Sequence, residues 1–242
     1  MSPPARGVAV VSGGGSGIGR VVALELGRRG HPLALLGRRR EPLEETLAMA
    51  GGAGASRDDG LALACDVRDA AAIERAAAEI HARYEAAEVV VPAAGVVFIR
   101  PLVETSLAEL QETLATNLGG VFLLLRALLP AMVERGRGHL FPLLSVAARR
   151  GFPGWSAYCA SKWGLAGLVA SLREELQGSG LRVTAVYPGA TDTPLWDGQP
   201  GEWKRESMVR PEEVARAIGF ALDGDAGSVI EEIHLGPAGG AL

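Results

Sequence analysis

The sequence predicts a doubly wound α/β fold, in which helices cover both faces of a seven-stranded parallel sheet. Short, continuous apolar runs alternate with longer helical patterns along the 242 residues, and such uninterrupted runs indicate strands that are buried on both faces. A glycine-rich turn directly follows the first run, as is typical of Rossmann-like folds. The length fits a single domain over 1–242, and no internal repeat or long linker divides it.

Each element follows from a local pattern. A β-branched run predicts the first strand at 8–11, and the stretch after the glycine-rich turn predicts a helix over 17–30. Further strands are expected at 33–36, 61–65, 89–91, 139–145, 181–187 and 229–235, further helices at 41–50, 69–87, 156–177 and 211–222, and a loop at 51–60.

One long helix is expected over 106–135. Ser106 is a suitable N-cap, and Glu109 stands three residues later, where it completes a capping box. Pro130 lies inside this stretch and is expected to kink the helix or end it early.

Composition excludes several classes of protein. The formal net charge is −4 and the longest basic run is three arginines, which argues against a nucleic-acid-binding protein. The apolar stretches are short and interrupted, so no membrane span is expected, and residues 1–6 show no apolar signal segment. Two cysteines favour a reduced, cytoplasmic protein without a disulfide framework. The four histidines are scattered, which argues against a metal site.

Some residue types are scarce, and their positions are therefore informative. The chain has a single asparagine, Asn117, and two lysines, Lys162 and Lys204, whereas its 33 glycines are spread throughout. The glycine-rich turn is thus weak evidence by its composition alone. Its place between a strand and a helix is stronger evidence, because backbone N–H groups there can bind a pyrophosphate at the helix N-terminus. The residues of this candidate cofactor loop are Gly13, Ser16, Gly17, Ile18 and Gly19.

The end of the second strand addresses the adenosine ribose in this fold. Gly37 stands where an acidic residue would bind both ribose hydroxyls, and Arg38 and Arg39 follow it. Arginine complements a 2′-phosphate, so the sequence favours NADP(H) over NAD(H). The alternative is that these arginines only solvate the end of a strand.

Three further residues form a catalytic pattern. Tyr158 and Lys162 are four residues apart and share one helix face. A neighbouring cation would lower the pKa of the phenol toward the neutral range. Ser145, at the carboxyl end of a central strand, could hydrogen-bond the reacting oxygen.

With these motifs the chain resembles the classical short-chain dehydrogenase/reductase family over nearly its whole length. The glycine motif, the serine, Tyr-x-x-x-Lys and the Pro-Gly-x-x-x-Thr segment that begins at Pro188 all have counterparts. The resemblance implies that Tyr158 is the general acid in carbonyl reduction and that Lys162 lowers its pKa and binds the nicotinamide ribose. It implies that Ser145 orients the carbonyl and that Asn117 holds a proton-relay water. It also implies cofactor contacts from Asp66, Val67, Ala94, Gly95, Pro188, Gly189, Thr191 and Thr193.

Two prolines depart from the family pattern. Pro92 and Pro142 stand at positions where the family often has asparagine, and Leu144 replaces a serine. Proline removes a ladder donor from a strand. We therefore expect a locally repacked, drier patch of sheet near the cofactor, with catalysis preserved.

The aromatic residues near the motifs allow two interpretations. A short substrate lid is expected at about 194–210, with Trp196 and Trp203 in an apolar roof, although a plain surface loop is an alternative. Trp155 could wall the pocket or be structural, whereas Trp163 and Cys159 are interpreted as packing residues. The sequence places no charged residue in the substrate pocket, which favours a bulky or aromatic ketone over a charged acyl carrier.

The expected function is that of a cytoplasmic NADP(H)-dependent carbonyl reductase or alcohol dehydrogenase that acts on a ketone or secondary alcohol. Two alternatives remain: an NAD(H)-dependent dehydrogenase of the same family, and a catalytically idle regulator that senses NADP(H). The resemblance further implies a homotetramer or homodimer, while the composition argues against a nucleic-acid partner, a membrane partner and a metal.

Overall fold

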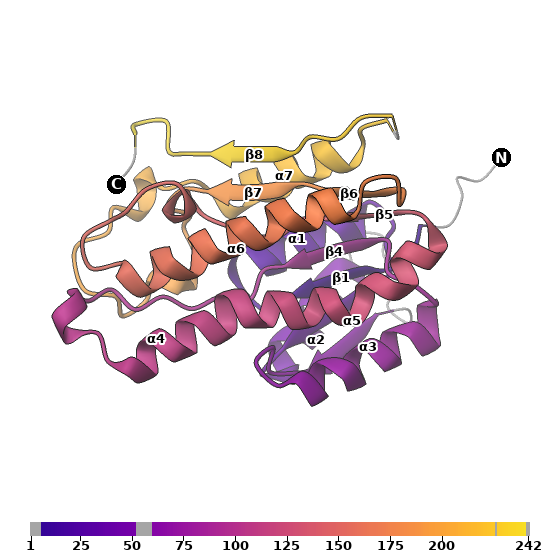
Figure 1. Ribbon diagram of the computed structural model, residues 1–242, viewed down its shortest axis with the longest axis horizontal. Coiled ribbons are helices and arrows are strands. Elements are labelled where there is room, and N and C mark those ends of the chain that lie inside the picture. Colours follow the sequence, from indigo (N-terminus) through magenta and orange to yellow (C-terminus); the bar gives the residue numbers. More distant parts are fainter. Residues whose placement is uncertain (1–5, 52–59, 226, 241–242) are drawn as a thin grey trace.

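The computed structural model describes residues 6–51, 60–225 and 227–240 of the chain. Its core is a parallel six-stranded sheet in the order β3-β2-β1-β4-β5-β6 (Figure 1). The strands are β1 (Ala9–Ser12), β2 (Leu33–Gly37), β3 (Leu61–Ala64), β4 (Val89–Pro92), β5 (Gly138–Leu140) and β6 (Leu181–Val183). The predicted doubly wound α/β class is confirmed. The predicted loop at 51–60 lies almost wholly outside the described residues.

A second, two-stranded parallel sheet holds the remaining strands, β7 (Ala185–Pro188) and β8 (Glu232–Leu235). One predicted strand, 181–187, is thus divided into β6 and β7 at Thr184. The two sheets stay in contact, because Leu143 bridges to Val186 and the Leu144 N–H donates to the Val186 carbonyl at 2.8 Å. The seven predicted strands are therefore present, but they do not form one continuous ladder.

The two prolines explain where the ladder breaks. The predicted strand 139–145 was too long, since β5 ends at Leu140, two residues before Pro142. A proline has no N–H to donate, whereas its carbonyl can still accept. Val186 donates to the Pro142 carbonyl at 3.0 Å, and Leu143 donates to the Pro92 carbonyl at 3.3 Å. Both prolines therefore still accept a ladder hydrogen bond and lack only the one that an N–H would donate. The drier patch of sheet expected near the cofactor stays a prediction.

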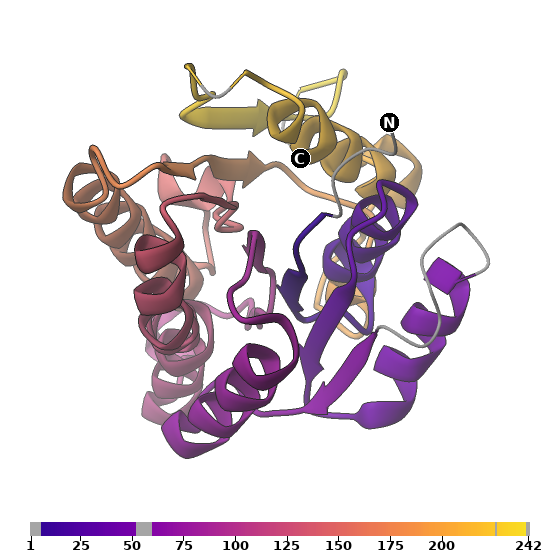
Figure 2. The ribbon, with the colours of Figure 1, turned by 90° about the vertical axis from the view of Figure 1, so that its right-hand side faces the viewer.

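Seven α-helices are described, and they cover the sheet on both faces (Figure 2). Side chains of β1 alternate between two cores, with Val10 in one and Val11 in the other. One core is shared with α3, α5 and α6, and the other with α1, α2 and α7. The bounds are α1 (Gly17–Arg28), α2 (Arg40–Gly51), α3 (Ala70–Tyr84), α4 (Leu107–Leu114), α5 (Gly120–Arg135), α6 (Ser156–Glu175) and α7 (Pro211–Leu222).

The predicted long helix is present, with two departures from expectation. The capping box of Ser106 and Glu109 is confirmed. Pro130 does not end the helix, which continues to Arg135 and stops at Gly136, a left-handed residue with φ 68°. A π-helical turn, η3 (Ala115–Gly119), separates α4 from α5.

The helical stretch Leu107–Arg135 is longer and more apolar than the short, interrupted apolar stretches expected from the sequence. Its 29 residues include an 18-residue window of mean hydropathy 1.6, which is long and apolar enough to cross a membrane by length and composition alone. Its place in the fold accounts for this composition, because α5 contributes Leu124, Leu128 and Met132 to the core shared with α3 and α6. A buried core helix of a soluble protein passes the same test.

Candidate active site

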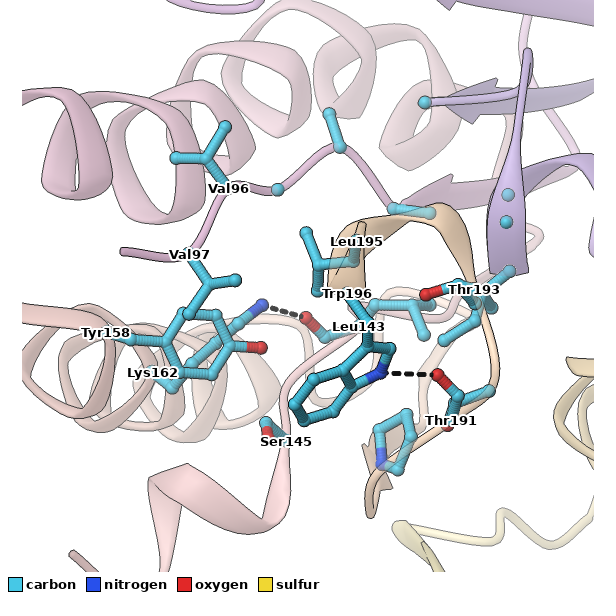
Figure 3. Close-up of a pocket in the computed structure, with 18 of the residues that line it drawn as sticks. Val96, Val97, Leu143, Ser145, Tyr158, Lys162, Thr191, Thr193, Leu195 and Trp196 are labelled. Atoms are coloured by element: carbon cyan, nitrogen blue, oxygen red, sulfur yellow. Dashed lines mark hydrogen bonds between the residues drawn. The ribbon is translucent and has the colours of Figure 1, made fainter. Parts of the chain in front are cut away.

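A cleft of about 1160 Å³ lies at the carboxyl ends of the parallel strands. This edge of the sheet is where doubly wound folds bind ligands. The cleft brings together the glycine-rich loop after β1, the residues that follow β2 and β3, the start of α6 and the segment after β7. Figure 3 shows the part around Tyr158 of α6 and Thr191 and Thr193 after β7. Nearly all of the predicted site residues therefore meet in one cavity.

The glycines of the loop are required by backbone conformation and close approach. Gly13 and Gly17 have φ values of 70° and 51°, which side chains rarely adopt. A Cβ on Gly19 would lie 2.3 Å from the Gly13 carbonyl oxygen, and one on Gly13 would lie 2.9 Å from the Ala94 nitrogen. Ser16 is the N-cap of α1, yet its side chain makes no cap hydrogen bond. The loop therefore presents a bare backbone and a hydroxyl at a helix N-terminus, as a pyrophosphate site requires.

The residues after β2 and β3 form a cationic end of the cleft. Arg38 and Arg39 are exposed and line the cavity, and neither forms an ion pair with any other residue in the described ranges. Asp66 is held by a fork of hydrogen bonds from Arg68, including Nη2 to Oδ2 at 2.7 Å. These bonds keep the pKa of the Asp66 carboxyl below its usual range. Asp66 is therefore paired with Arg68, whereas Arg38 and Arg39, which follow β2, form no ion pair in the described ranges.

Tyr158, Lys162 and Ser145 are brought together at the centre of the cleft (Figure 3). Lys162 Nζ lies 5.7 Å from the centroid of the Tyr158 ring and donates to the Leu143 carbonyl at 2.7 Å. All three side chains are buried. The sequence correctly placed the two helical residues on one face and the serine beside them.

The pKa values differ from the expectation for the phenol. Burial raises the pKa of Tyr158 to about 12, and hydrogen bonding with Ser145 only partly opposes this rise. Burial also lowers the pKa of Lys162 to about 8. The ammonium points at the Leu143 carbonyl rather than at the phenol, so Ser145 is the neighbour that lowers the pKa of Tyr158.

Asn117 lies in the π-helical turn and is fully buried. Its Oδ1 accepts from the Val96 N–H at 2.9 Å, and its Nδ2 donates to the Val96 carbonyl at 2.9 Å and to Ser161 Oγ at 3.1 Å. The side chain therefore fixes the loop after β4, in which Gly95 and Val96 line the cleft. With its side chain occupied in this way, Asn117 could hold a relay water only through its main chain, and that role stays a prediction.

The segment after β7 reaches the glycine-rich loop. Thr191 Oγ1 donates to the Gly189 carbonyl at 3.0 Å, and a Cβ on Gly17 would lie 3.3 Å from Thr193 Cβ. Four of the predicted cofactor residues in this segment line the cleft, as do three that follow β3 and β4: Pro188, Gly189, Thr191 and Thr193, and Val67, Ala94 and Gly95.

Tryptophan rings lie beside Tyr158 in the cleft, and the expected substrate lid at about 194–210 stays a prediction. The Trp155 ring meets the Tyr158 ring edge-on at 5.5 Å, and Trp196 and Trp203 pack together with centroids 4.5 Å apart. All three tryptophans line the cleft. Trp163 is half-exposed and is absent from the described lining of this cleft, and its interpretation as a packing residue stays a prediction.

Two residues of the segment 194–210, Gln199 and Arg205, make contacts that the sequence did not indicate. Gln199 Nε2 donates to the Val97 carbonyl at 3.2 Å, which connects the lid to the loop after β4. Arg205 forms ion pairs with Asp192 and Asp197, near the start of this segment.

Arg150 also lines the cleft, contrary to the expectation that no charged residue reaches the substrate pocket. Its position in the sequence between Ser145 and Tyr158, two residues of the predicted site, could have indicated that Arg150 lies at the cleft.

Within the described residues, no group of three or more His, Cys, Asp or Glu side chains could hold a metal ion. The candidate site combines the Tyr158 phenol, the Lys162 ammonium and the Ser145 hydroxyl with the glycine-rich loop after β1.

Comparisons with known proteins agree with this geometry. Residues 7–202 match the family model of the short chain dehydrogenases. The chain is 35% identical to a sepiapterin reductase of Chlorobaculum tepidum over 242 residues, which cover 97% of this chain and 98% of that protein. It is also 35% identical to a D-threitol dehydrogenase of Mycolicibacterium smegmatis, over 96% of this chain and 92% of that one.

Solved structures show the same fold. A metagenomic short-chain oxidoreductase in complex with NADP superposes with a TM-score of 0.81 at 32% identity, over 95% of this chain and 96% of that chain. An alcohol dehydrogenase from the archaeon Thermococcus sibiricus, complexed with 5-hydroxy-NADP, gives a TM-score of 0.87 at 29% identity, over 96% and 97%.

Proposed function

Because the chain belongs to the short-chain dehydrogenase family of oxidoreductases, we propose that it is an NADP(H)-dependent reductase of ketones, or a dehydrogenase of the corresponding secondary alcohols. The observation that carries the cofactor proposal is the cationic end of the cleft. Arg38 and Arg39 have no carboxylate partner among the described residues, and the adjacent Asp66 is already neutralised by Arg68. The related structures support the same cofactor, because the metagenomic enzyme is in complex with NADP and the archaeal enzyme with 5-hydroxy-NADP.

The residues of the cleft fit a dinucleotide. Without Cβ atoms, Gly13 and Gly19 let the loop fold closely on itself and on Ala94, so that main-chain N–H groups at the start of α1 can approach a pyrophosphate. The 2′-phosphate would lie against Arg38 and Arg39, and Thr193 would contact the nicotinamide end. When bound, the nicotinamide supplies or accepts the hydride.

The remaining steps belong to this chain's own side chains. In the direction of reduction, Tyr158 Oη donates a proton to the carbonyl oxygen, while the Ser145 hydroxyl hydrogen-bonds the same oxygen. Lys162 provides a buried positive charge 5.7 Å from the centre of the phenol ring and would bind the ribose hydroxyls. The roof of Trp155, Trp196 and Trp203 would exclude water and offer an apolar surface to the substrate.

The cofactor and the chemistry are tested in one set of assays. We expect kcat/KM for NADPH to exceed that for NADH by at least about tenfold, since a phosphate bound by arginine gains charge-assisted hydrogen bonds. Arg38→Ala should remove most of that preference by raising the KM for NADPH. A clear NADH preference in the wild type would instead favour the NAD(H)-dependent dehydrogenase.

The same assays distinguish an enzyme from a sensor. Tyr158→Phe removes the proton donor, so we expect ketone reduction to fall by at least about a hundredfold while NADPH still binds, as measured by fluorescence titration. If the wild type reduces no member of a broad ketone panel yet binds NADPH, the idle regulator becomes the better description.

We also propose that the protein is cytoplasmic and assembles as a homodimer or homotetramer. The exposed Phe122 of α5 and Trp163 of α6 support a helical interface, and both described cysteines are free. Sedimentation velocity would give the number of subunits.

A further inference from the structure

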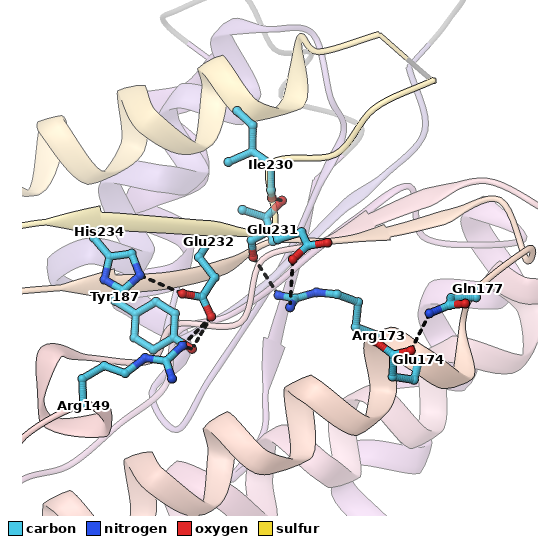
Figure 4. A network of polar contacts seen from close by, with 10 residues as sticks. Arg149, Arg173, Glu174, Gln177, Tyr187, Ile230, Glu231, Glu232 and His234 are labelled. Atoms are coloured by element: carbon cyan, nitrogen blue, oxygen red, sulfur yellow. Dashed lines mark hydrogen bonds and ion pairs between the residues drawn. The ribbon is translucent and has the colours of Figure 1, made fainter.

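The charges that line the cleft are almost all positive. Asp66 is the single acidic residue among the described residues that line it, and Arg68 neutralises it. Of the cations, Lys162 donates to a carbonyl and Arg149 is paired with Glu232 (Figure 4). The cations without a carboxylate partner among the described residues are therefore Arg38, Arg39 and Arg150.

These cations lie at two separate ends. Arg38 and Arg39 follow β2, whereas Arg150 follows the extension of β5, in the segment between Ser145 and Tyr158. In the sheet order β2-β1-β4-β5 the two strands are three positions apart, which corresponds to ~14 Å at the usual strand spacing. The proposed 2′-phosphate site accounts for the arginines of β2, but it leaves Arg150 at the substrate end without an explanation.

The main chain of Arg150 is fixed while its guanidinium is available. The Arg150 N–H donates to the Val146 carbonyl at 3.2 Å, and its own carbonyl accepts from Cys159 Sγ at 3.8 Å. The guanidinium carbon lies over the Phe152 ring, 4.5 Å from its centroid, which favours a position beside the aromatic wall. A guanidinium held in this way keeps its edge free for a bidentate contact with a carboxylate.

Aromatic rings connect this cation to the catalytic phenol. The Phe152 ring lies 5.4 Å from the Trp155 ring, which in turn meets Tyr158 at 5.5 Å. A substrate whose carbonyl is bound by Tyr158 and Ser145 would therefore place an aryl group along Trp155 and Phe152. Any group beyond that ring would reach Arg150.

We propose that Arg150 is a specificity-determining residue and that the substrate class is an aryl ketone with a carboxylate on the far side of the ring from the ketone. This inference rests on the proposed ketone reductase activity and goes beyond it by assigning a charge to the substrate.

The test compares isosteric substrates that differ in charge. The ratio of kcat/KM for 4-acetylbenzoate to that for 4-acetylbenzamide is measured with NADPH, and the measurement is repeated with 3-(4-acetylphenyl)propanoate and its amide to vary the spacer. We expect the carboxylate to be preferred about tenfold or more for at least one spacer, mainly through KM, because a charged hydrogen bond contributes more than a neutral one.

Variants then assign the preference to one side chain. Arg150→Gln should bring the ratio close to one, and Arg150→Lys should retain part of it. Arg137→Gln is the matched control, because it removes an exposed, unpaired arginine in the described turn before β5, at the opposite edge of the sheet; it should leave the ratio unchanged.

Two results would overturn the inference while leaving the reductase intact. One is a ratio of one or less for both spacers in the wild type, and the other is an unchanged ratio in Arg150→Gln. If neither the carboxylates nor the amides are reduced while other ketones of the panel are, the inference alone is overturned; if no ketone of the panel is reduced, the reductase activity falls with it.

Discussion

At the scale of single residues, the site depends on glycines that lack a Cβ atom as much as on the side chains that do the chemistry. Most of the 33 glycines carry no information about function, whereas Gly19 is fixed by the Gly13 carbonyl 2.3 Å from the position of its missing Cβ. The sequence identified the loop from its place between a strand and a helix. The close approach inside the loop is a tertiary fact that spacing alone does not contain.

This close approach gives a prediction for Gly19→Ala. The new methyl group must displace the main chain of Gly13, so we expect the Kd for NADPH to rise by about tenfold or more, since several phosphate contacts depend on that loop. Isothermal titration calorimetry with NADPH measures the change. Gly227→Ala is the control, because no heavy atom of the described residues, its chain neighbours aside, lies within 4 Å of the Cβ position there. Equal affinities in the two variants would contradict the prediction.

At the scale of elements, local patterns located the helices well and the strand ends less well. The capping box and the proline at the first position of α7 were visible in the sequence. The break between β6 and β7 was not, because it lies opposite Pro142 on a neighbouring strand and no local signal at Thr184 reports it. The π-helical turn at Asn117 was also unforeseen, since its hydrogen-bond partners lie 21 and 44 residues away in the chain.

The π-helical turn and the loop after β4 are coupled through Asn117. Asn117→Ala leaves the Val96 N–H and carbonyl without their partner, and a buried polar group left unsatisfied costs about 1–3 kcal/mol. We expect the free energy of unfolding to fall by roughly 2–4 kcal/mol, with a matching loss of reductase activity as the loop moves. Urea denaturation measures the first and an NADPH assay the second. A stability within about 0.5 kcal/mol of the wild type would contradict this account.

At the scale of the whole molecule, one buried histidine helps to join the two sheets. His139 Nε2 contacts Thr184 Oγ1 at 2.7 Å, and that hydroxyl donates to the Ile230 carbonyl at 2.6 Å, which links β5 to the segment before β8. The His139 Nδ1 atom is buried without a hydrogen-bond partner. Burial, aided by the charge of Arg182, lowers the pKa of His139 to about 3.

This pKa predicts how stability depends on pH. The unfolded chain takes up a proton at this histidine below its ordinary pKa of about 6.5, whereas the folded protein does not until about pH 3. Stability is therefore lost as the pH falls from about 6.5 toward 3, at up to ~1.4 kcal/mol per pH unit. His31, whose pKa burial also lowers, acts in the same direction.

Denaturation curves at pH 7 and pH 5 measure this dependence. In His139→Leu we expect the stability difference between these pH values to shrink by roughly 2 kcal/mol, whatever the variant costs in stability at pH 7. A His139→Leu protein with the full wild-type dependence on pH would contradict the assignment.

The one-sided charge of the cleft also has a consequence for the speed of binding. The protein as a whole carries a formal charge of −4, and its surface therefore repels anions weakly at long range. Arg38, Arg39 and Arg150 line the same cleft at its two ends, so an anionic ligand that diffuses near the cleft is attracted toward it. Focusing of this kind raises the rate of productive encounter, and it fades as ionic strength increases. The arginines would thus control how often ligands arrive, as well as which ligands stay.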